Sequence, residues 1–125
     1  DDLWFLPGPM DDEPDYLRAY VFDGEDSQAV SIAMWQMLAA ECAARQATRL
    51  LVLEDLISTV DVTEIEGVIE AMEQAGIARV RCAFVELRDD IQGSELGEIM
   101  CRERGMTVRI FSQEPLARRW LIYGD

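Results

Sequence analysis

The sequence contains neither histidine nor lysine among its 125 residues. Without histidine the chain forms no Ser-His-Asp triad, no histidine-ligated metal site and no histidine acid–base pair. Its eight glycines match neither the G-x-G-x-x-G nor the G-x-x-x-x-G-K-[ST] phosphate-binding pattern. The three cysteines, Cys42, Cys82 and Cys101, form no C-x-x-C pair, so we interpret them as reduced core residues. We therefore predict a protein that is not an enzyme, with no catalytic residue, no cofactor and no metal.

Basic residues are few as well: eleven arginines stand against 25 acidic residues, for a formal net charge of −14. Such a chain repels phosphate backbones and anionic headgroups, which argues against binding to nucleic acid or to a membrane surface. No apolar run reaches the roughly 18 residues of a membrane span, and no signal peptide is visible. We predict a cytoplasmic protein. The arginine-only basic set and the absence of asparagine are typical of a GC-rich bacterial coding sequence.

The acidic residues are concentrated at the start of the chain. Residues 1–26 hold nine acidic residues and one arginine, a net charge of −8. Residues 3–6 and 17–22 are apolar runs typical of strands, and the proline, glycine and aspartate residues between them are typical of turns. The pattern predicts a β-hairpin with a long acidic loop.

Strands alternate with helices over the rest of the chain. Continuous apolar runs predict strands at 49–53, 80–87 and 107–111, and residues 54–60 are predicted to be a loop. Helical periodicity predicts helices at 27–46, 61–76 and 94–104, with Ser27 or Asp26 as the first cap and Gly76 as a stop. A last helix holds Pro115 in its first turn.

This order, β-β-α-β-α-β-α-β-α, predicts a single α/β domain over residues 1–125. We expect a mixed, mostly parallel five-stranded sheet with helices packed against it and the first hairpin strand antiparallel at an edge.

Each predicted helix has an apolar side that we expect to be buried. The first helix is apolar around most of its circumference, so residues 28–46 are also a candidate face for a homodimer. In the later helices the residues expected to be buried are Val62, Ile65, Val68, Ile69 and Met72, then Leu96, Ile99 and Met100, and finally Leu116, Ala117, Trp120 and Leu121.

Hydroxyl groups gather where the second long helix begins. Ser58, Thr59 and Thr63 lie just before or inside its first turn, and Asp61 with Glu64 has the spacing of a capping box. A helix N-terminus accommodates a phosphoryl group, because its N–H groups are unsatisfied and its dipole is positive there. We predict a phosphorylation site and partner surface formed by Ser58, Thr59, Asp61 and Thr63, with ordinary turn chemistry as the alternative.

The end of the chain carries the most specific likeness to a known family. The strand 108–111 is followed by Ala117 and then by Trp120-Leu121. Together with the leading hairpin, the first helix and the strand 50–53, this ending resembles the SpoIIAA-like proteins, the broad group of STAS domains and their STAS/SEC14-type relatives. The resemblance covers nearly the whole chain.

The resemblance implies a small regulatory or interaction domain. In anti-sigma factor antagonists, a serine within an Asp-Ser-Ser-Gly-like stretch at the start of the second helix is phosphorylated by a partner kinase. The matching stretch here is Ile57-Ser58-Thr59-Val60-Asp61, which keeps the hydroxyls and lacks the preceding aspartate and the glycine. The implied partner is a kinase or a sigma-regulatory protein.

Two other functions remain open. Six methionines and the apolar first helix favour a binder of a small lipophilic ligand, as the SEC14-type relatives imply. The acidic pairs Glu54-Asp55 and Asp89-Asp90 each follow a predicted strand, where their oxygens could hold a hard cation. The function predicted first is a non-enzymatic module that binds a protein partner.

Overall fold

A computed structural model describes residues 6–13, 15–25, 27–57, 61–88 and 91–124. The strands are β1 (Leu6–Asp12), β2 (Leu17–Glu25), β3 (Arg49–Ile57), β4 (Arg81–Glu86) and β5 (Thr107–Phe111). The helices are α1 (Gln28–Arg45), α2 (Ile65–Ala75), α3 (Ile91–Glu103) and α4 (Glu114–Tyr123), and two short 3₁₀ turns are η1 (Val62–Glu64) and η2 (Ile77–Arg79). The α/β class that the sequence predicts is confirmed.

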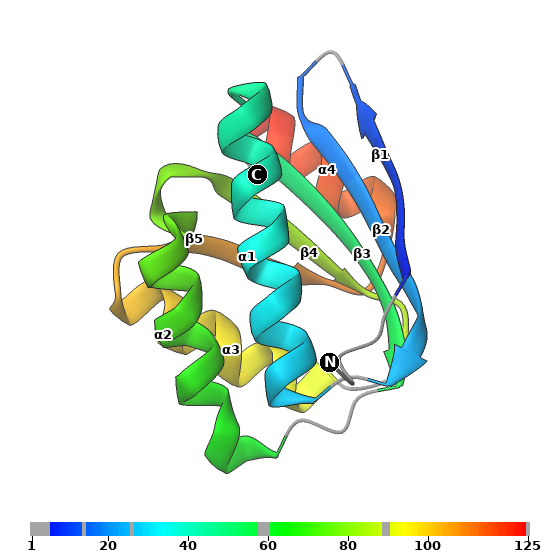
Figure 1. Ribbon diagram of the computed structural model, residues 1–125. Helices are drawn as coiled ribbons and strands as arrows, with labels where there is room; N and C mark the ends of the chain where they lie inside the picture. The colour runs from blue at the N-terminus through cyan, green and yellow to red at the C-terminus, as the bar shows by residue number, and fades with distance from the viewer. Residues whose placement is uncertain (1–5, 14, 26, 58–60, 89–90, 125) are drawn as a thin grey trace.

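The strands form one sheet in the order β1-β2-β3-β4-β5. Strands β2 to β5 are mutually parallel, and β1 pairs antiparallel with β2 at one edge. Because each parallel strand is added on the same side of the one before, right-handed crossovers bring α1, α2 and α3 to one face. Helix α4 follows the last strand and lies behind the sheet (Figure 1).

The two faces enclose cores of different size. The face under α1, α2 and α3 contains a cluster of 22 buried apolar residues, which includes Leu38, Leu50 and Met72. The face under α4 contains seven, which include Leu51, Trp120 and Leu121. The neighbours Leu50 and Leu51 in β3 are both fully buried, one on each face, as strand alternation requires.

Local sequence accounts for several ends of the helices. The Ser27 hydroxyl oxygen accepts a hydrogen bond from the Val30 N–H at 3.2 Å, which confirms the predicted first cap. Helix α2 ends at Gly76, which has a φ of 98°, the left-handed conformation that glycine adopts without strain. Within the described ranges, no helix is both long and apolar enough to cross a bilayer.

Two predicted loops are partly strand. The proline-, glycine- and aspartate-rich segment after residue 6 is predicted to be turns, but β1 runs from Leu6 to Asp12 through Pro7 and Pro9, which an edge strand tolerates because it needs few ladder N–H groups. Residues 3–5 of the predicted first strand lie outside the described residues. The expected loop at 54–60 is partly strand, since β3 continues to Ile57 by pairing with β2 as far as Glu25.

Three residues that were predicted to be buried are exposed: Val62, Ile99 and Leu116. Val62 lies in η1, whose tighter turn removes it from the α-helical side formed by Ile65, Val68 and the following apolar residues. Ile99 lines the hollow beside β5, and Leu116 lies in the first turn of α4, which is tied to β2 by the ion pair of Glu114 with Arg18.

The predicted homodimer face on α1 is buried on one side only. Residues such as Met34 and Leu38 pack against the sheet, while Ala29, Gln36 and Ala40 are exposed. A contact between copies through residues 28–46 stays a prediction.

Candidate functional site

The start of α2 is a turn held by its own side chains. The Asp61 carboxylate accepts hydrogen bonds from the Thr63 N–H at 3.1 Å and from the Thr63 hydroxyl at 3.2 Å. The Asp61 N–H in turn donates to Glu64 Oε1 at 3.4 Å. This is the capping box that the spacing of Asp61 and Glu64 predicts, and it fixes the turn before α2 begins.

A side chain from α1 fastens this turn to the rest of the molecule. The Gln28 amide nitrogen donates to the Glu64 carbonyl oxygen at 3.0 Å. Gly67, one turn further along α2, allows the approach, because a Cβ there would lie 2.6 Å from the same nitrogen. The role of Gln28 is not evident from the sequence pattern, although a glycine inside a helical pattern is the signal of such a close approach.

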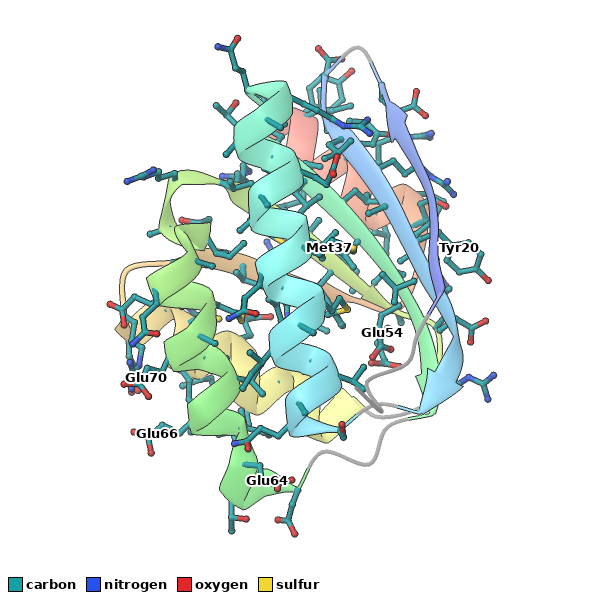
Figure 2. All side chains as sticks on the ribbon, viewed as in Figure 1. Tyr20, Met37, Glu54, Glu64, Glu66 and Glu70 are labelled. Atoms are coloured by element: carbon teal, nitrogen blue, oxygen red, sulfur yellow. The ribbon has the colours of Figure 1, made fainter. Side chains whose placement is uncertain are left out.

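The outer side of the turn faces solvent. Asp61, Val62 and Thr63 are all exposed, and Val62 is 61% exposed. Figure 2 shows Glu66 and Glu70 on one side of α2, with Glu64 at η1 below them. The structure therefore brings Asp61 and Thr63 of the predicted site together. Ser58 and Thr59 lie outside the described residues.

Two carboxylates are buried where the pairing of β3 with β4 ends. Glu54 and Glu86 occupy partner positions in the β3–β4 pairing and are only 2% and 5% exposed. The Glu86 carboxylate accepts the backbone N–H of Arg88 at 3.1 Å. Both side chains belong to the face of the sheet covered by α1, α2 and α3, and Figure 2 shows Glu54 directed toward α1.

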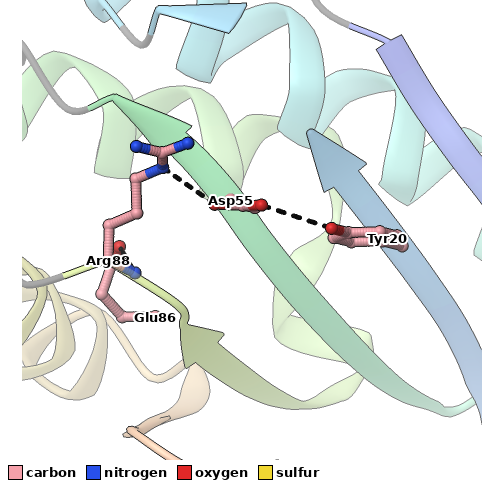
Figure 3. A network of polar contacts seen from close by, with 4 residues as sticks. All are labelled: Tyr20, Asp55, Glu86 and Arg88. Atoms are coloured by element: carbon pink, nitrogen blue, oxygen red, sulfur yellow. Dashed lines mark hydrogen bonds and ion pairs between the residues drawn. The ribbon is translucent and has the colours of Figure 1, made fainter. Parts of the chain in front are cut away.

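The neighbouring Asp55 lies on the opposite face of the sheet. It accepts a hydrogen bond from the Tyr20 hydroxyl at 3.3 Å and forms an ion pair with Arg88 at 2.8 Å (Figure 3). Partial burial and the Asp55 carboxylate raise the pKa of Tyr20. The network joins β2, β3 and the end of β4, so its members could not be grouped from sequence spacing.

Glu54 and Asp55 therefore lie on opposite faces of the sheet. The cation hypothesis instead requires the carboxylate oxygens of this pair to bind one ion together. Asp89 and Asp90 lie outside the described residues. Among the residues that the structure does describe, no group of three cysteine or acidic side chains could hold a metal ion.

The three cysteines are buried in the larger core, as predicted. Burial raises the pKa of the Cys42 thiol to about 11 and that of Cys101 to about 12. Burial also raises the pKa of Cys82 well above its usual value. All three are protonated at neutral pH, a state in which a thiol is a poor nucleophile.

A hollow of about 510 Å³ lies between α3 and β5, a size within the usual range of ligand pockets, roughly 300–1,000 Å³. Four of its lining residues are charged: Glu95, Glu98, Arg102 and Arg109. Such a lining differs from the apolar wall that the lipophilic-ligand hypothesis requires.

Compared with known proteins, the chain matches no protein-family model and no curated protein sequence.

Proposed function

We propose that this chain is a cytoplasmic, non-enzymatic regulatory module of the STAS type that binds a protein partner through the start of α2. The observation that carries the proposal is the turn Asp61–Glu64, which is held on its inner side and exposed on its outer side. The order of strands and helices, with its two leading strands and its final β5–α4 pair, supports the family likeness.

The turn has the properties of a recognition surface. Its backbone is fixed by the capping box and by Gln28, so little conformational entropy is lost when a partner binds. Val62 supplies an exposed apolar side chain, and its sequence neighbours Asp61 and Glu64 supply negative charge. Glu66, which follows in the first turn of α2, is paired with Arg104 at 3.5 Å. An apolar centre inside a polar rim is the usual anatomy of a protein–protein interface.

Phosphorylation of Ser58 or Thr59 would act on this surface directly. A phosphoryl group adds a charge of about −1.5 to −2 at neutral pH. It would stand close in sequence to the carboxylates of Asp61 and Glu64 and add negative charge to theirs. We expect the added charge to loosen the turn and weaken partner binding.

Affinity capture from the native cell extract tests the proposal, with quantitative mass spectrometry of the retained proteins. The baits are the natural protein, Val62→Asp and Leu116→Asp; the last removes an exposed apolar side chain remote from α2 in sequence and position. We expect a partner that the natural protein and Leu116→Asp retain and that Val62→Asp loses. Equal retention by all three baits would contradict the proposed surface.

A second comparison addresses the switch. The double variant Ser58→Asp, Thr59→Asp should retain at least several-fold less of the same partner, and phosphate should be found on Ser58 or Thr59 of protein from the native cells. If the double variant binds the partner as the natural protein does, phosphorylation does not control binding. The proposed partner surface is not contradicted by that result.

A further inference from the structure

Charge is distributed unevenly between the two sides of the sheet. The protein as a whole has 25 acidic residues and eleven arginines. Among the described side chains of α4 and of the sheet face beneath it, only Asp55 and Glu114 are acidic. The arginines of this layer are Arg18, Arg49, Arg81, Arg88, Arg109, Arg118 and Arg119. The α4 layer is therefore a basic face on an acidic protein, and it lies on the far side of the sheet from α2 (Figure 1).

Most of these arginines form no ion pair in the described part of the chain. Arg18 and Arg88 are paired with the two acidic residues of the layer. On the opposite face, the arginines that pair with glutamates are Arg45, Arg102 and Arg104. The arginines of the α4 layer that pair with no described carboxylate are Arg49, Arg81, Arg109, Arg118 and Arg119. We call these five residues the α4 basic patch.

The members of the patch gather around one aromatic ring. The guanidinium carbon of Arg81 lies 3.8 Å from the centre of the Trp120 ring, and that of Arg109 lies 5.9 Å from it. Arg49 occupies the partner position of Arg81 in the β3–β4 pairing, so both side chains leave the same face of the sheet. The other two members directly precede Trp120 in α4 and are exposed. The five positive charges therefore form one continuous surface.

The contact with aromatic rings leaves hydrogen-bond donors of the arginines available. A guanidinium stacks on a ring through its flat face, whereas its five N–H groups lie in its plane and can still bind a carboxylate. The side chain of Arg81 donates one hydrogen bond to a described residue, from Nη2 to the Trp120 carbonyl. Arg109 lies over the rings of Phe111 and Trp120 and donates none to a described residue. The rings thus hold both groups in place before a ligand binds, which lowers the entropy cost of binding.

The exposed side of α4 adds apolar groups to the positive charges. Leu116, Arg119 and Tyr123 follow one another at intervals of three and four residues, so they share one side of the helix. Leu116 is 52% exposed and Tyr123 is 79% exposed. A small inorganic anion gains nothing from these apolar side chains. A nucleic acid would continue beyond the patch onto acidic surface that repels it.

We propose that the α4 basic patch, together with Leu116 and Tyr123, binds an acidic polypeptide segment of a partner protein, whose carboxylates pair with the arginines and whose apolar side chains contact α4. At physiological ionic strength charges are screened beyond about 8 Å. The acidic residues of α2, which lie across the sheet, therefore repel such a segment only weakly. The contact is on the opposite face from the proposed α2 surface and does not depend on the proposed function.

Fluorescence anisotropy with a defined probe tests the proposal. The probe is a labelled peptide of about twelve residues that repeats Glu-Glu-Leu, which is long enough to span the ten residues of α4. A matched peptide repeats Gln-Gln-Leu. We expect the acidic peptide to bind at physiological salt and the neutral one not to bind. In the NMR spectrum the indole N–H signal of Trp120 should shift on binding, whereas that of Trp35, in the larger core on the other face, should not.

Two double variants with the same change of charge locate the site. Arg118→Gln, Arg119→Gln should weaken binding of the acidic peptide about fivefold, because two exposed ion pairs are lost. Arg102→Gln, Arg104→Gln, on the opposite face, is the matched control and should bind the peptide as the natural protein does.

Three results would overturn the proposal. The first is an acidic peptide that does not bind at concentrations up to about 1 mM. The second is equal weakening by both double variants, which would assign binding to net charge rather than to the α4 basic patch. The third is a single-stranded DNA of similar length that binds more tightly than the peptide and is weakened by Arg118→Gln, Arg119→Gln, which would make the patch a site for phosphates.

Discussion

The two faces of the sheet are covered in different ways. One face lies under α1, α2 and α3 and is held by a large apolar core, whereas the other lies under the ten residues of α4. At the two ends of α4, arginines from the sheet supplement the smaller core. Arg18 of β2 forms an ion pair with Glu114 at the first turn, and Arg81 of β4 donates to the Trp120 carbonyl in the last turn.

The difference shows what a short terminal helix needs in order to stay on a sheet. Apolar burial is non-directional and proportional to area, so a small contact leaves the position of a helix weakly specified. Directional contacts at each end fix it. The positive charge of Arg81 near the last carbonyls and the negative charge of Glu114 in the first turn also complement the helix dipole.

A comparison of Leu50→Ala with Leu51→Ala tests the difference between the two faces of the sheet. Of the predictions made here, these substitutions have the largest expected effect. Both side chains are fully buried and adjacent in β3, so the two variants differ mainly in the face that loses volume. Leucine-to-alanine changes in cores cost about 2–5 kcal/mol. We expect Leu50→Ala to lie in the upper part of that range, because three packed helices cannot close the cavity.

Leu51→Ala should cost less, since α4 is short, is near the end of the chain and can move toward the strand. Urea unfolding of both variants measures the difference in the free energy of unfolding. Equal losses would mean that α4 is packed as rigidly as the three-helix face.

Much of the architecture could be predicted because apolar periodicity is a local property of the sequence. The alternation of strands and helices, the cap at Ser27, the stop at Gly76 and the capping box of Asp61 with Glu64 all follow from residues close together in the chain. The unequal cover of the two faces could not be predicted in this way. Continuous apolar strands such as 50–53 show burial on both sides but not how much covers each side.

In the candidate site, too, only the contacts between residues close together in the sequence could be predicted. Asp61 and Thr63 could be identified because their partners are within three residues. The Gln28 contact depends on how closely α1 and α2 pack, and the Tyr20–Asp55–Arg88 network depends on the strand order. A helical pattern gives angles around the axis but not the width of the surface that a neighbour covers, which is why Ile99 and Leu116 are predicted to be buried. It also does not reveal the 3₁₀ turn that exposes Val62.

Arg81→Met removes the contact at the end of α4. The guanidinium carbon of Arg81 lies 3.8 Å from the centre of the Trp120 ring, and methionine keeps the apolar stem without the charge or the hydrogen bond. We expect a loss of about 1–2 kcal/mol in the free energy of unfolding. Arg79→Met, at an exposed arginine two residues earlier, is the control and should change stability little. Similar losses in both variants would show that Arg81 does not anchor α4.

The variant Glu114→Gln tests the contact at the first turn of α4 through the pH dependence of the free energy of unfolding. The hydrogen bond from Arg18 holds the pKa of Glu114 below its usual 4.5. A lowered pKa in the folded state stabilises the protein above the unfolded pKa, and this stability is lost as pH falls through the folded pKa. Because both side chains are about 30% exposed, we expect a contribution of about 0.5–1 kcal/mol at neutral pH.

The measurement is the free energy of unfolding from pH 7 down to about pH 3. Glu114→Gln should be less stable than the natural protein at neutral pH and approach it in acid. Glu70→Gln, on the exposed side of α2, controls for the removal of one negative charge. If the free energy of unfolding of Glu114→Gln equals that of the natural protein at every pH, apolar contacts alone hold α4 in position.

The smallest effect concerns the three-helix face, where α1 and α2 touch at Gly67. Alanine in a helix interior stabilises by about 0.5–1 kcal/mol over glycine, but here its Cβ would displace the Gln28 amide from the Glu64 carbonyl. The two terms should nearly cancel in Gly67→Ala, whereas the same change in a Gln28→Ala background should show the full gain. A double-mutant cycle therefore isolates a coupling of about 1 kcal/mol between positions 28 and 67. If Gly67→Ala stabilises equally in both backgrounds, Gln28 moves aside at no cost, and the start of α2 is positioned by its own capping box rather than by α1.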